Sequence, residues 1–191
     1  MIIILIGPIG AGKTIVGEVL SQRLGCKQVS LDLLRFDYYE EIGYSRDIAK
    51  QLGEREGFGA VVRYWKPFEA HSVERVLSDY GQRDCVIDFG AGHSVYEDEA
   101  LFERVQRALA PFPWVVLLLP SLDIETSLSV IHDREPSLVE MADINRHFLS
   151  HPSNQRLAKH VVCTADITPR QVADEILAWI KDSEDNAQGP A

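Results

Sequence analysis

The sequence IIILIGPIGAGKT, at residues 2–14, decides the fold of this chain. Its first part, Ile2–Ile6, is wholly apolar and mostly β-branched, as is typical of a buried strand. Its second part, Gly7–Thr14, fits the pattern G-x-x-x-x-G-K-[ST]. Residues 15–24 then carry apolar side chains at helical spacing. A strand, a glycine loop and a helix in this order form the context in which the pattern predicts a phosphate-binding site.

The chemistry of the loop explains its residue types. Glycines allow unusual backbone angles, so that several N–H groups can approach one phosphate, and the following helix directs its positive end there. Lys13 can reach the β- and γ-phosphates, and the Thr14 hydroxyl can ligate Mg²⁺. We therefore expect ATP and Mg²⁺ as cofactors, with nucleotide contacts from Gly7, Pro8, Ile9, Gly10, Ala11, Gly12, Lys13, Thr14 and Ile15.

Composition limits the class of protein. The chain has 191 residues, 46% of them hydrophobic, and a formal net charge of −10, which argues against a nucleic-acid-binding surface. No apolar run is long enough for a membrane span, and the three cysteines lack metal-site spacing, which fits a reducing cytoplasm. We expect one cytoplasmic domain over residues 1–182, present as a monomer or weak homodimer, and a flexible tail over residues 183–191.

Short apolar runs alternate with helical patterns along the rest of the chain. Strands are expected at Ile2–Ile6, Gln28–Leu31, Cys85–Phe89, Trp114–Leu119 and His160–Cys163. Further helices are expected at about 33–42, 45–55, 67–80, 97–109, 123–133, 140–149 and 168–181, with Pro67 in a first turn. This alternation predicts an α/β fold with a parallel sheet, whose ligands bind at the carboxyl ends of the strands.

Asp32 follows the second expected strand and would lie beside the glycine loop. A carboxylate there can orient an acceptor hydroxyl and take its proton, or help to hold Mg²⁺ through water. It can also be an N-cap for a helix that starts at Leu33, and one side chain could do both.

The third strand ends in Asp88 and is followed by Gly90, Ala91, Gly92 and His93. An acidic residue at the end of an apolar strand is the Walker B arrangement, so Asp88 is a candidate Mg²⁺ ligand together with Thr14. A capping aspartate in a tight turn is the alternative. The glycines let backbone approach a bound substrate, and His93 either touches that substrate or is an ordinary surface histidine.

Arg134 precedes Pro136 in a segment placed like a mobile lid, at about residues 134–142. A lid arginine can neutralise charge on the transferred phosphoryl group while closure excludes water. The alternative is an arginine that favours a solvated helix C-terminus.

With these motifs in place, the chain resembles the shikimate kinase family of P-loop kinases over nearly its whole length. The resemblance rests on Gly7–Thr14, on Asp32, on the stretch Trp65–Glu69, on Val86–Gly92, on Arg134–Leu138 and on the closing segment from Pro152 to Pro169. It implies a three-layer α/β/α fold, a five-stranded parallel sheet in the order 2-3-1-4-5, and a small lid. It also implies that Lys13, Asp32 and Arg134 are catalytic, and that Asp32, Lys66, Gly90, Ala91 and Gly92 bind the acceptor.

The departures from the family concern the acceptor half. Ser30 stands where the family has a first aspartate, so that Asp88 would take over its Mg²⁺ role. Lys66 replaces a substrate-gripping arginine and cannot offer the same two-pronged contact. Ser150 stands in place of the arginine that binds the carboxylate of shikimate.

The sequence thus predicts an enzyme that moves the γ-phosphate of ATP to a hydroxyl of a small metabolite, which we do not expect to be shikimate. Two alternatives remain open. One is a nucleoside, nucleotide or antibiotic kinase of similar fold. The other is an ATP-binding switch or pseudokinase without acceptor chemistry.

Overall fold

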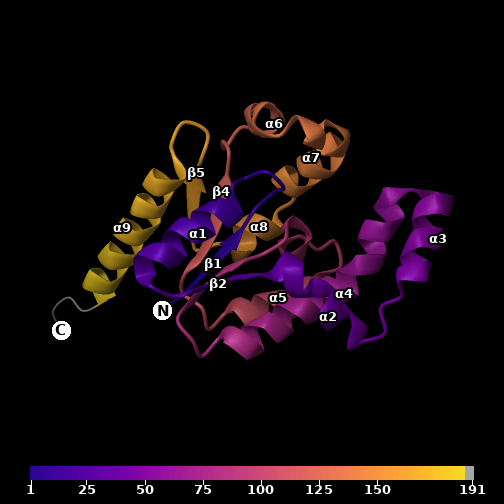
Figure 1. Ribbon diagram of the computed structural model, residues 1–191, viewed down its shortest axis with the longest axis horizontal. Coiled ribbons are helices and arrows are strands. Elements are labelled where there is room, and N and C mark those ends of the chain that lie inside the picture. Colours follow the sequence, from indigo (N-terminus) through magenta and orange to yellow (C-terminus); the bar gives the residue numbers. More distant parts are fainter. Residues whose placement is uncertain (188–191) are drawn as a thin grey trace.

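A computed structural model describes residues 1–187, which form a five-stranded parallel sheet with helices on both faces (Figure 1). The strand order is β2-β3-β1-β4-β5, and every pair of neighbours is parallel. The strands are β1 (Ile2–Ile6), β2 (Lys27–Ser30), β3 (Cys85–Asp88), β4 (Val115–Leu119) and β5 (His160–Cys163). The predicted α/β class and strand order are confirmed.

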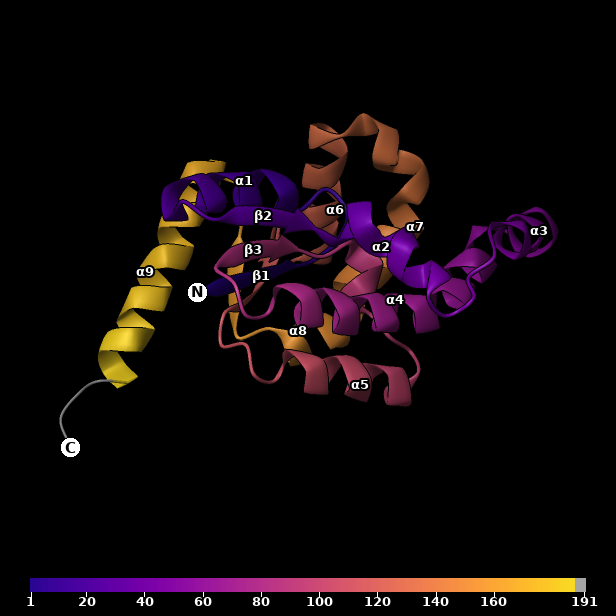
Figure 2. The ribbon, with the colours of Figure 1, turned by 60° about the horizontal axis from the view of Figure 1, so that its bottom comes forward.

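The central strand β1 contributes to hydrophobic cores on both faces of the sheet. Ile3 and Leu5 pack with residues of α1 (Lys13–Leu24) and α9 (Pro169–Ala187). Ile4 and Ile6 point the other way, toward α4 (Phe58–Tyr80) and α5 (Glu99–Leu109). Because successive strand residues face opposite sides, one apolar run supplies both cores. Figure 2 shows the resulting layers, with α1 and α9 on one side of the sheet and α4 and α5 on the other.

Most of the remaining helices lie near the carboxyl ends of the strands. They are α2 (Leu31–Glu40), α3 (Arg46–Glu56), α6 (Ile124–Arg134), α7 (Ala142–Ser150) and α8 (Ser153–Leu157), with short 3₁₀ helices η1 (Ala91–Ser94) and η2 (Pro136–Met141). In both ribbon views α6 and α7 lie together above this edge, and α3 projects at the far end of the molecule (Figures 1 and 2). No helix within residues 1–187 has the length and apolarity needed to cross a membrane.

Two of the helix predictions need correction. Helix α4 begins at Phe58, so Pro67 lies inside the helix and not in its first turn. The break before α4 comes instead from Gly57, whose φ of 82° is a left-handed value that suits glycine. Helix α8 was not predicted, since its five residues are too few to show a helical period.

The predicted tail also needs correction. Helix α9 continues to Ala187, so residues 183–187 are helical and not a flexible tail. The hydroxyl of Ser183 donates to the carbonyl of Trp179 at 2.8 Å, which keeps this part in the helical path. The rest of the predicted tail, residues 188–191, lies outside the described residues.

Candidate active site

The loop after β1 has the shape that a phosphate cradle requires. Gly7, Gly10 and Gly12 have φ values of 140°, 77° and 94°, all in the region that other residues rarely adopt. Gly7 also lies against β4, where an added Cβ would be 2.2 Å from the carbonyl oxygen of Leu118. The loop leads directly into α1, whose first N–H groups are available to an anion.

Lys13 lies inside this loop and is only 9% exposed. Its Nζ donates to the carbonyl oxygens of Gly7 and Pro8, at 2.9 and 2.8 Å. Burial lowers the pKa of Lys13 to about 8, and the nearby carboxylates of Asp32 and Asp88 act in the opposite direction. The structure therefore brings three of the predicted site residues into one electrostatic cluster.

The carboxylate of Asp88 is buried and held by neutral donors. It accepts from Gln28 Nε2 at 2.7 Å and from Ser30 Oγ at 2.9 Å. The same Gln28 amide donates to the carbonyl oxygen of Thr14 at 2.9 Å, which ties Asp88 to the start of α1. Within residues 1–187 the Asp88 carboxylate has no direct cationic partner, and Gln28 links it to Thr14. Such a carboxylate fits Mg²⁺, which prefers hard oxygen ligands and retains several waters. Ser30 supports the acid here, at the position where the family has its first aspartate.

A cavity of about 290 Å³ lies on the α9 side of the loop. It is lined by Gly10, Ala11, Gly12, Ile15, Val16, Arg134, Thr164, Ile167, Pro169 and Val172. Arg134 is anchored there: Nη1 donates to Thr164 Oγ1 at 3.1 Å, and Nη2 donates to the carbonyl oxygens of Thr164 and Ala165. The guanidinium thus lines the same cavity as the loop glycines, while the lid role of residues 134–142 stays a prediction.

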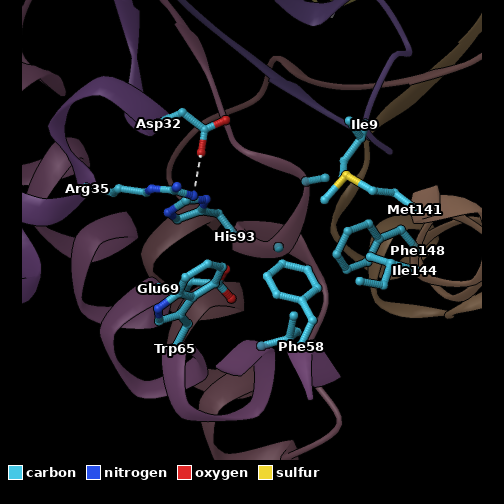
Figure 3. A pocket seen from close by; sticks show the side chains of 13 residues that line it. Ile9, Asp32, Arg35, Phe58, Trp65, Glu69, His93, Met141, Ile144 and Phe148 are labelled. Carbon is cyan, nitrogen blue, oxygen red and sulfur yellow. Dashed lines mark hydrogen bonds and ion pairs between the residues drawn. The ribbon is translucent and has the colours of Figure 1, made fainter. Parts of the chain in front are cut away.

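Asp32 lies in the first turn of α2 but does not cap it. The helix begins at Leu31, and its N-cap residue is Ser30, so the alternative role of Asp32 as a cap was wrong. The side chain is half exposed, and Oδ1 accepts from Arg35 Nη1 at 3.2 Å. One turn of helix therefore presents a carboxylate and a guanidinium side by side (Figure 3).

A second cavity, which we call the acceptor cavity, has a volume of about 280 Å³ and opens beside Asp32. Its polar lining comes from Asp32, Arg35, Glu69, Gly92 and His93. Its apolar lining comes from Ile9, Phe58, Val62, Trp65, Ala91, Met141, Ile144 and Phe148. Figure 3 shows these side chains around a common space, with the loop residue Ile9 on one wall. A cavity that adjoins both the phosphate loop and Asp32 can hold a small molecule within reach of a bound γ-phosphate.

Lys66 is not among the residues that line the acceptor cavity. It is 5% exposed, and Nζ donates to Glu69 Oε2 at 2.7 Å and to the carbonyl oxygens of Gly92 and Val95, both at 3.0 Å. An ammonium group has three donors, and all three are used here. The geometry therefore makes Lys66 a support of the segment from Gly92 to Val95, and its contact with substrate stays a prediction.

The wall of the acceptor cavity is fastened to the phosphate loop. The backbone N–H of Ile9 donates to Oδ1 of Asn145, on α7, at 3.0 Å. Asn145 is almost fully buried, and its neighbours Ile144 and Phe148 line the cavity. Phosphate loop and cavity wall are thus joined by one direct hydrogen bond.

Sequence reasoning missed two polar residues of this site, Arg35 and Glu69, and left the role of a third, His93, open. Arg35 had a detectable signal, because it lies three residues after Asp32 on one helix. Glu69 belongs to the stretch Trp65–Glu69, but nothing in that stretch marks the acid as a site residue. His93 has the sequence context of a surface histidine, whereas it is 1% exposed and lines the cavity.

No protein-family model matches the chain. It is 30% identical over 183 residues to a shikimate kinase of Marinomonas sp. (strain MWYL1), across 94% of this chain and 91% of that protein. It is also 25% identical over 198 residues to threonine synthase-like 1 of Homo sapiens, across 96% of this chain. The chain spans only 23% of the length of that human relative. Among solved structures, it is similar to shikimate kinase from Acinetobacter baumannii in complex with shikimate, with a TM-score of 0.62, 21% identity, and coverage of 95% and 93% of the two chains.

Proposed function

Because the chain belongs to the shikimate kinase-like family of P-loop kinases, we propose that it transfers the γ-phosphate of ATP to a hydroxyl group of a small metabolite. One observation carries the proposal. A phosphate loop, the carboxylates of Asp32 and Asp88, and a cavity of about 280 Å³ meet at one edge of the sheet. This is the set of parts that phosphoryl transfer needs, since its catalysis is mostly positioning and charge stabilisation.

Each side of the site has a separate task. The loop backbone and Lys13 bind the β- and γ-phosphates, and Lys13 exchanges its loop carbonyls for phosphate oxygens. Thr14 and Asp88 would hold Mg²⁺, which would supply further neutralisation of the phosphate charge. Arg134 and the cavity around it receive the rest of the nucleotide. The hydrogen bond from Arg134 to Thr164 favours this role of Arg134 over direct contact with the transferred phosphoryl group.

The acceptor binds in the cavity beside Asp32, with Ala91 and Gly92 as part of one wall. The acceptor hydroxyl oxygen forms a new bond to the γ-phosphorus, and the proton of that hydroxyl passes to the Asp32 carboxylate. The bond from the γ-phosphorus to the β–γ bridging oxygen breaks, and that oxygen leaves with ADP. Asp32 thus serves as general base and as an orienting group.

Shikimate itself is a poor candidate for the acceptor. Lys66 is fully engaged inside the protein, and Ser150 is exposed at the end of α7 and absent from the cavity lining. Each lost charge-assisted contact to a carboxylate costs about 1.5–3 kcal/mol. Two such losses lower the affinity for shikimate by about two orders of magnitude or more.

The test is an ATP-dependent screen of a metabolite pool, with detection by mass of a product that has gained a phosphate. Lys13→Ala should abolish product formation because it removes the phosphate-binding cation. Lys181→Ala is the matched control, since Lys181 is exposed on α9. Full turnover by Lys13→Ala would contradict the proposal.

The second candidate is an ATP-binding switch without acceptor chemistry. It is favoured by the internal engagement of Lys66, which leaves the usual acceptor-binding position without a free cation. This candidate predicts nucleotide binding with slow hydrolysis and no phosphorylated small molecule. The same screen, run beside an assay for ADP release, separates the two functions.

A further inference from the structure

Asp32, Glu69 and His93 line the acceptor cavity (Figure 3), and all three side chains lie close to Gly90 or Gly92. A Cβ added at Gly90 would be 2.2 Å from Asp32 Oδ1 and 2.7 Å from His93 Nδ1. A Cβ added at Gly92 would be 2.1 Å from Glu69 Oε1. Gly90 has an ordinary φ of −61°, so it is space and not backbone strain that requires glycine there. The two glycines let helices α2 and α4 bring their acidic groups against η1.

His93 presents an unused hydrogen-bond acceptor to this cavity. Its Nδ1 lies 3.3 Å from the carbonyl oxygen of Gly90, which can only accept, so Nδ1 carries the proton. Burial lowers the pKa of His93 to about 4, and the ring is neutral near pH 7. Nε2 therefore carries a free lone pair, and within residues 1–187 this buried atom has no hydrogen-bond partner. A ligand group with an O–H or N–H would satisfy it.

The cations around the acceptor cavity are already matched with acids. Arg35 binds Asp32 at 3.2 Å, and Lys66 binds Glu69 at 2.7 Å. The Arg35 guanidinium also lies over the rings of Phe36 and Trp65, at 4.7 and 5.3 Å from their centres. A carboxylate on the acceptor would have to share the single charge of Arg35 with Asp32, the group that we propose as the base. An acidic acceptor would therefore add a negative charge that no further cation among the described lining residues balances.

We propose that the acceptor is a polyhydroxylated ring compound that carries no acidic group and donates a hydrogen bond to Nε2 of His93. The cavity offers acceptor atoms from Asp32, Glu69 and His93, which suit several hydroxyl or amino donors. Its aromatic wall, Phe58, Trp65 and Phe148, suits the C–H face of a sugar or cyclitol ring. This inference rests on the proposed kinase function, because it names the substrate class of that same site.

The first test measures binding separately from turnover. Calorimetry with ADP-saturated protein compares myo-inositol, glucose, glucosamine and 2-deoxystreptamine with the acids shikimate, quinate and gluconate. We expect at least one neutral or amino compound to bind about 100-fold more tightly than any of the acids. Tighter binding of an acid, or no binding by any of the neutral and amino compounds, would overturn the inference.

A mass assay on the same compounds with ATP separates this inference from the proposed function. Phosphorylation of a neutral or amino compound supports both. Binding of such a compound without phosphorylation keeps the assigned ligand class and contradicts the kinase function.

The second test isolates His93 with the compound that binds. His93→Asn can keep a polar group near Gly90 but removes the acceptor at the Nε2 position, whereas His93→Gln can place a carbonyl oxygen there. We expect His93→Asn to raise the acceptor KM by about 10-fold to 100-fold with the ATP KM unchanged, and His93→Gln to restore part of that loss.

The exposed His132, on α6, provides the control variant His132→Asn. A structural role of His93 would instead change both KM values and would not be rescued by glutamine. An unchanged acceptor KM in His93→Asn contradicts the contact.

Discussion

At Gly90, the absence of one methyl group determines which side chains can meet. The acid of α2 and the imidazole of η1 both occupy space that any side chain at position 90 would need. Lys13 also acts over short distances, since its one ammonium group donates to two carbonyl oxygens of its own loop. At the residue scale, the site therefore depends on the space that its glycines leave for other side chains and on the hydrogen-bond partners of its buried groups.

Substitution Gly90→Ala should damage the acceptor half and spare the nucleotide half. The new methyl group displaces Asp32 and His93, so we expect kcat/KM for the acceptor to fall by about 10-fold to 100-fold. Nucleotide affinity, measured by calorimetry, should stay close to that of the unmodified protein. The control is Gly59→Ala, because a Cβ there meets nothing closer than Arg63 Nη1 at 3.7 Å. Equal kinetic effects of the two substitutions would refute this role of Gly90.

The buried imidazole also predicts a pH-dependent stability. The pKa of His93 is about 4 in the folded protein, against an ordinary 6.5, since burial outweighs the opposing effect of Glu69 while Arg35 and Lys66 act with burial. The unfolded chain therefore binds more protons between these values, and stability falls as pH drops through that window. His93→Gln lacks this titration, so its deficit relative to the unmodified protein at pH 7 should shrink by about 2 kcal/mol at pH 5. Urea unfolding of both proteins at pH 7 and pH 5 measures this deficit in stability. A deficit that is the same at both pH values contradicts the lowered pKa of His93.

At the scale of elements, capping side chains mark where some of the helices begin. Asp98 caps α5 by accepting from Leu101 N at 3.0 Å, and Asp123 caps α6 by accepting from Thr126 N at 2.8 Å. The strand β2, by contrast, passes into α2 with no loop, and Ser30 serves both as the last strand residue and as the N-cap. Helices α2 and α5 thus begin in different ways.

The cap of α5 gives a direct test. Asp98→Ala should lower the free energy of unfolding by about 1 kcal/mol, because a backbone N–H in the first turn loses its acceptor. Asp98→Asn keeps an oxygen in place and should stay close to the unmodified protein. Denaturant midpoints measure both, and an equal loss in the two variants would show that charge and not capping matters at this position.

The same elements show how much of the structure could be predicted from the sequence. The strands were predictable because continuous apolar runs of five or so residues, bounded by turn residues, are typical of buried strands. The start of α2 was not predictable, since Asp32 and Ser30 are both good N-cap residues and only the pairing of β2 decides between them. The burial of His93 was out of reach, because it depends on α4 and α7, which lie far from it in sequence. Lys66 was found by resemblance, but its three hydrogen bonds inside the protein depend on the tertiary structure and could not be predicted.

For the whole molecule, the loop and the sheet form one cooperative unit. Strand β1 is hydrogen-bonded on both sides, to β3 and β4, and Gly7 packs on the backbone of β4 at Leu118. The phosphate loop therefore follows the central strand of the sheet. Damage to the core near β4 should lower stability and nucleotide binding together.

We expect Leu118→Ala to reduce the free energy of unfolding by about 2–5 kcal/mol, since Leu118 is fully buried and the substitution leaves a cavity. It should also weaken nucleotide binding, in contrast to Gly90→Ala. Leu122→Ala is the control, because that side chain is 77% exposed. Unfolding curves and calorimetry measure the two effects, and a destabilised Leu118→Ala with unaltered nucleotide affinity would show that loop and core are independent.

The hydrogen bond from Ile9 to Asn145 has a consequence for the order of events in a catalytic cycle. A phosphate that reorganises the loop also acts on α7, and a ligand that presses on α7 also acts on the loop. Thermodynamic linkage makes such an influence reciprocal, so the factor by which nucleotide changes acceptor affinity equals the factor by which acceptor changes nucleotide affinity. The binding of the two substrates is therefore expected to be coupled, and Asn145→Leu should weaken that coupling.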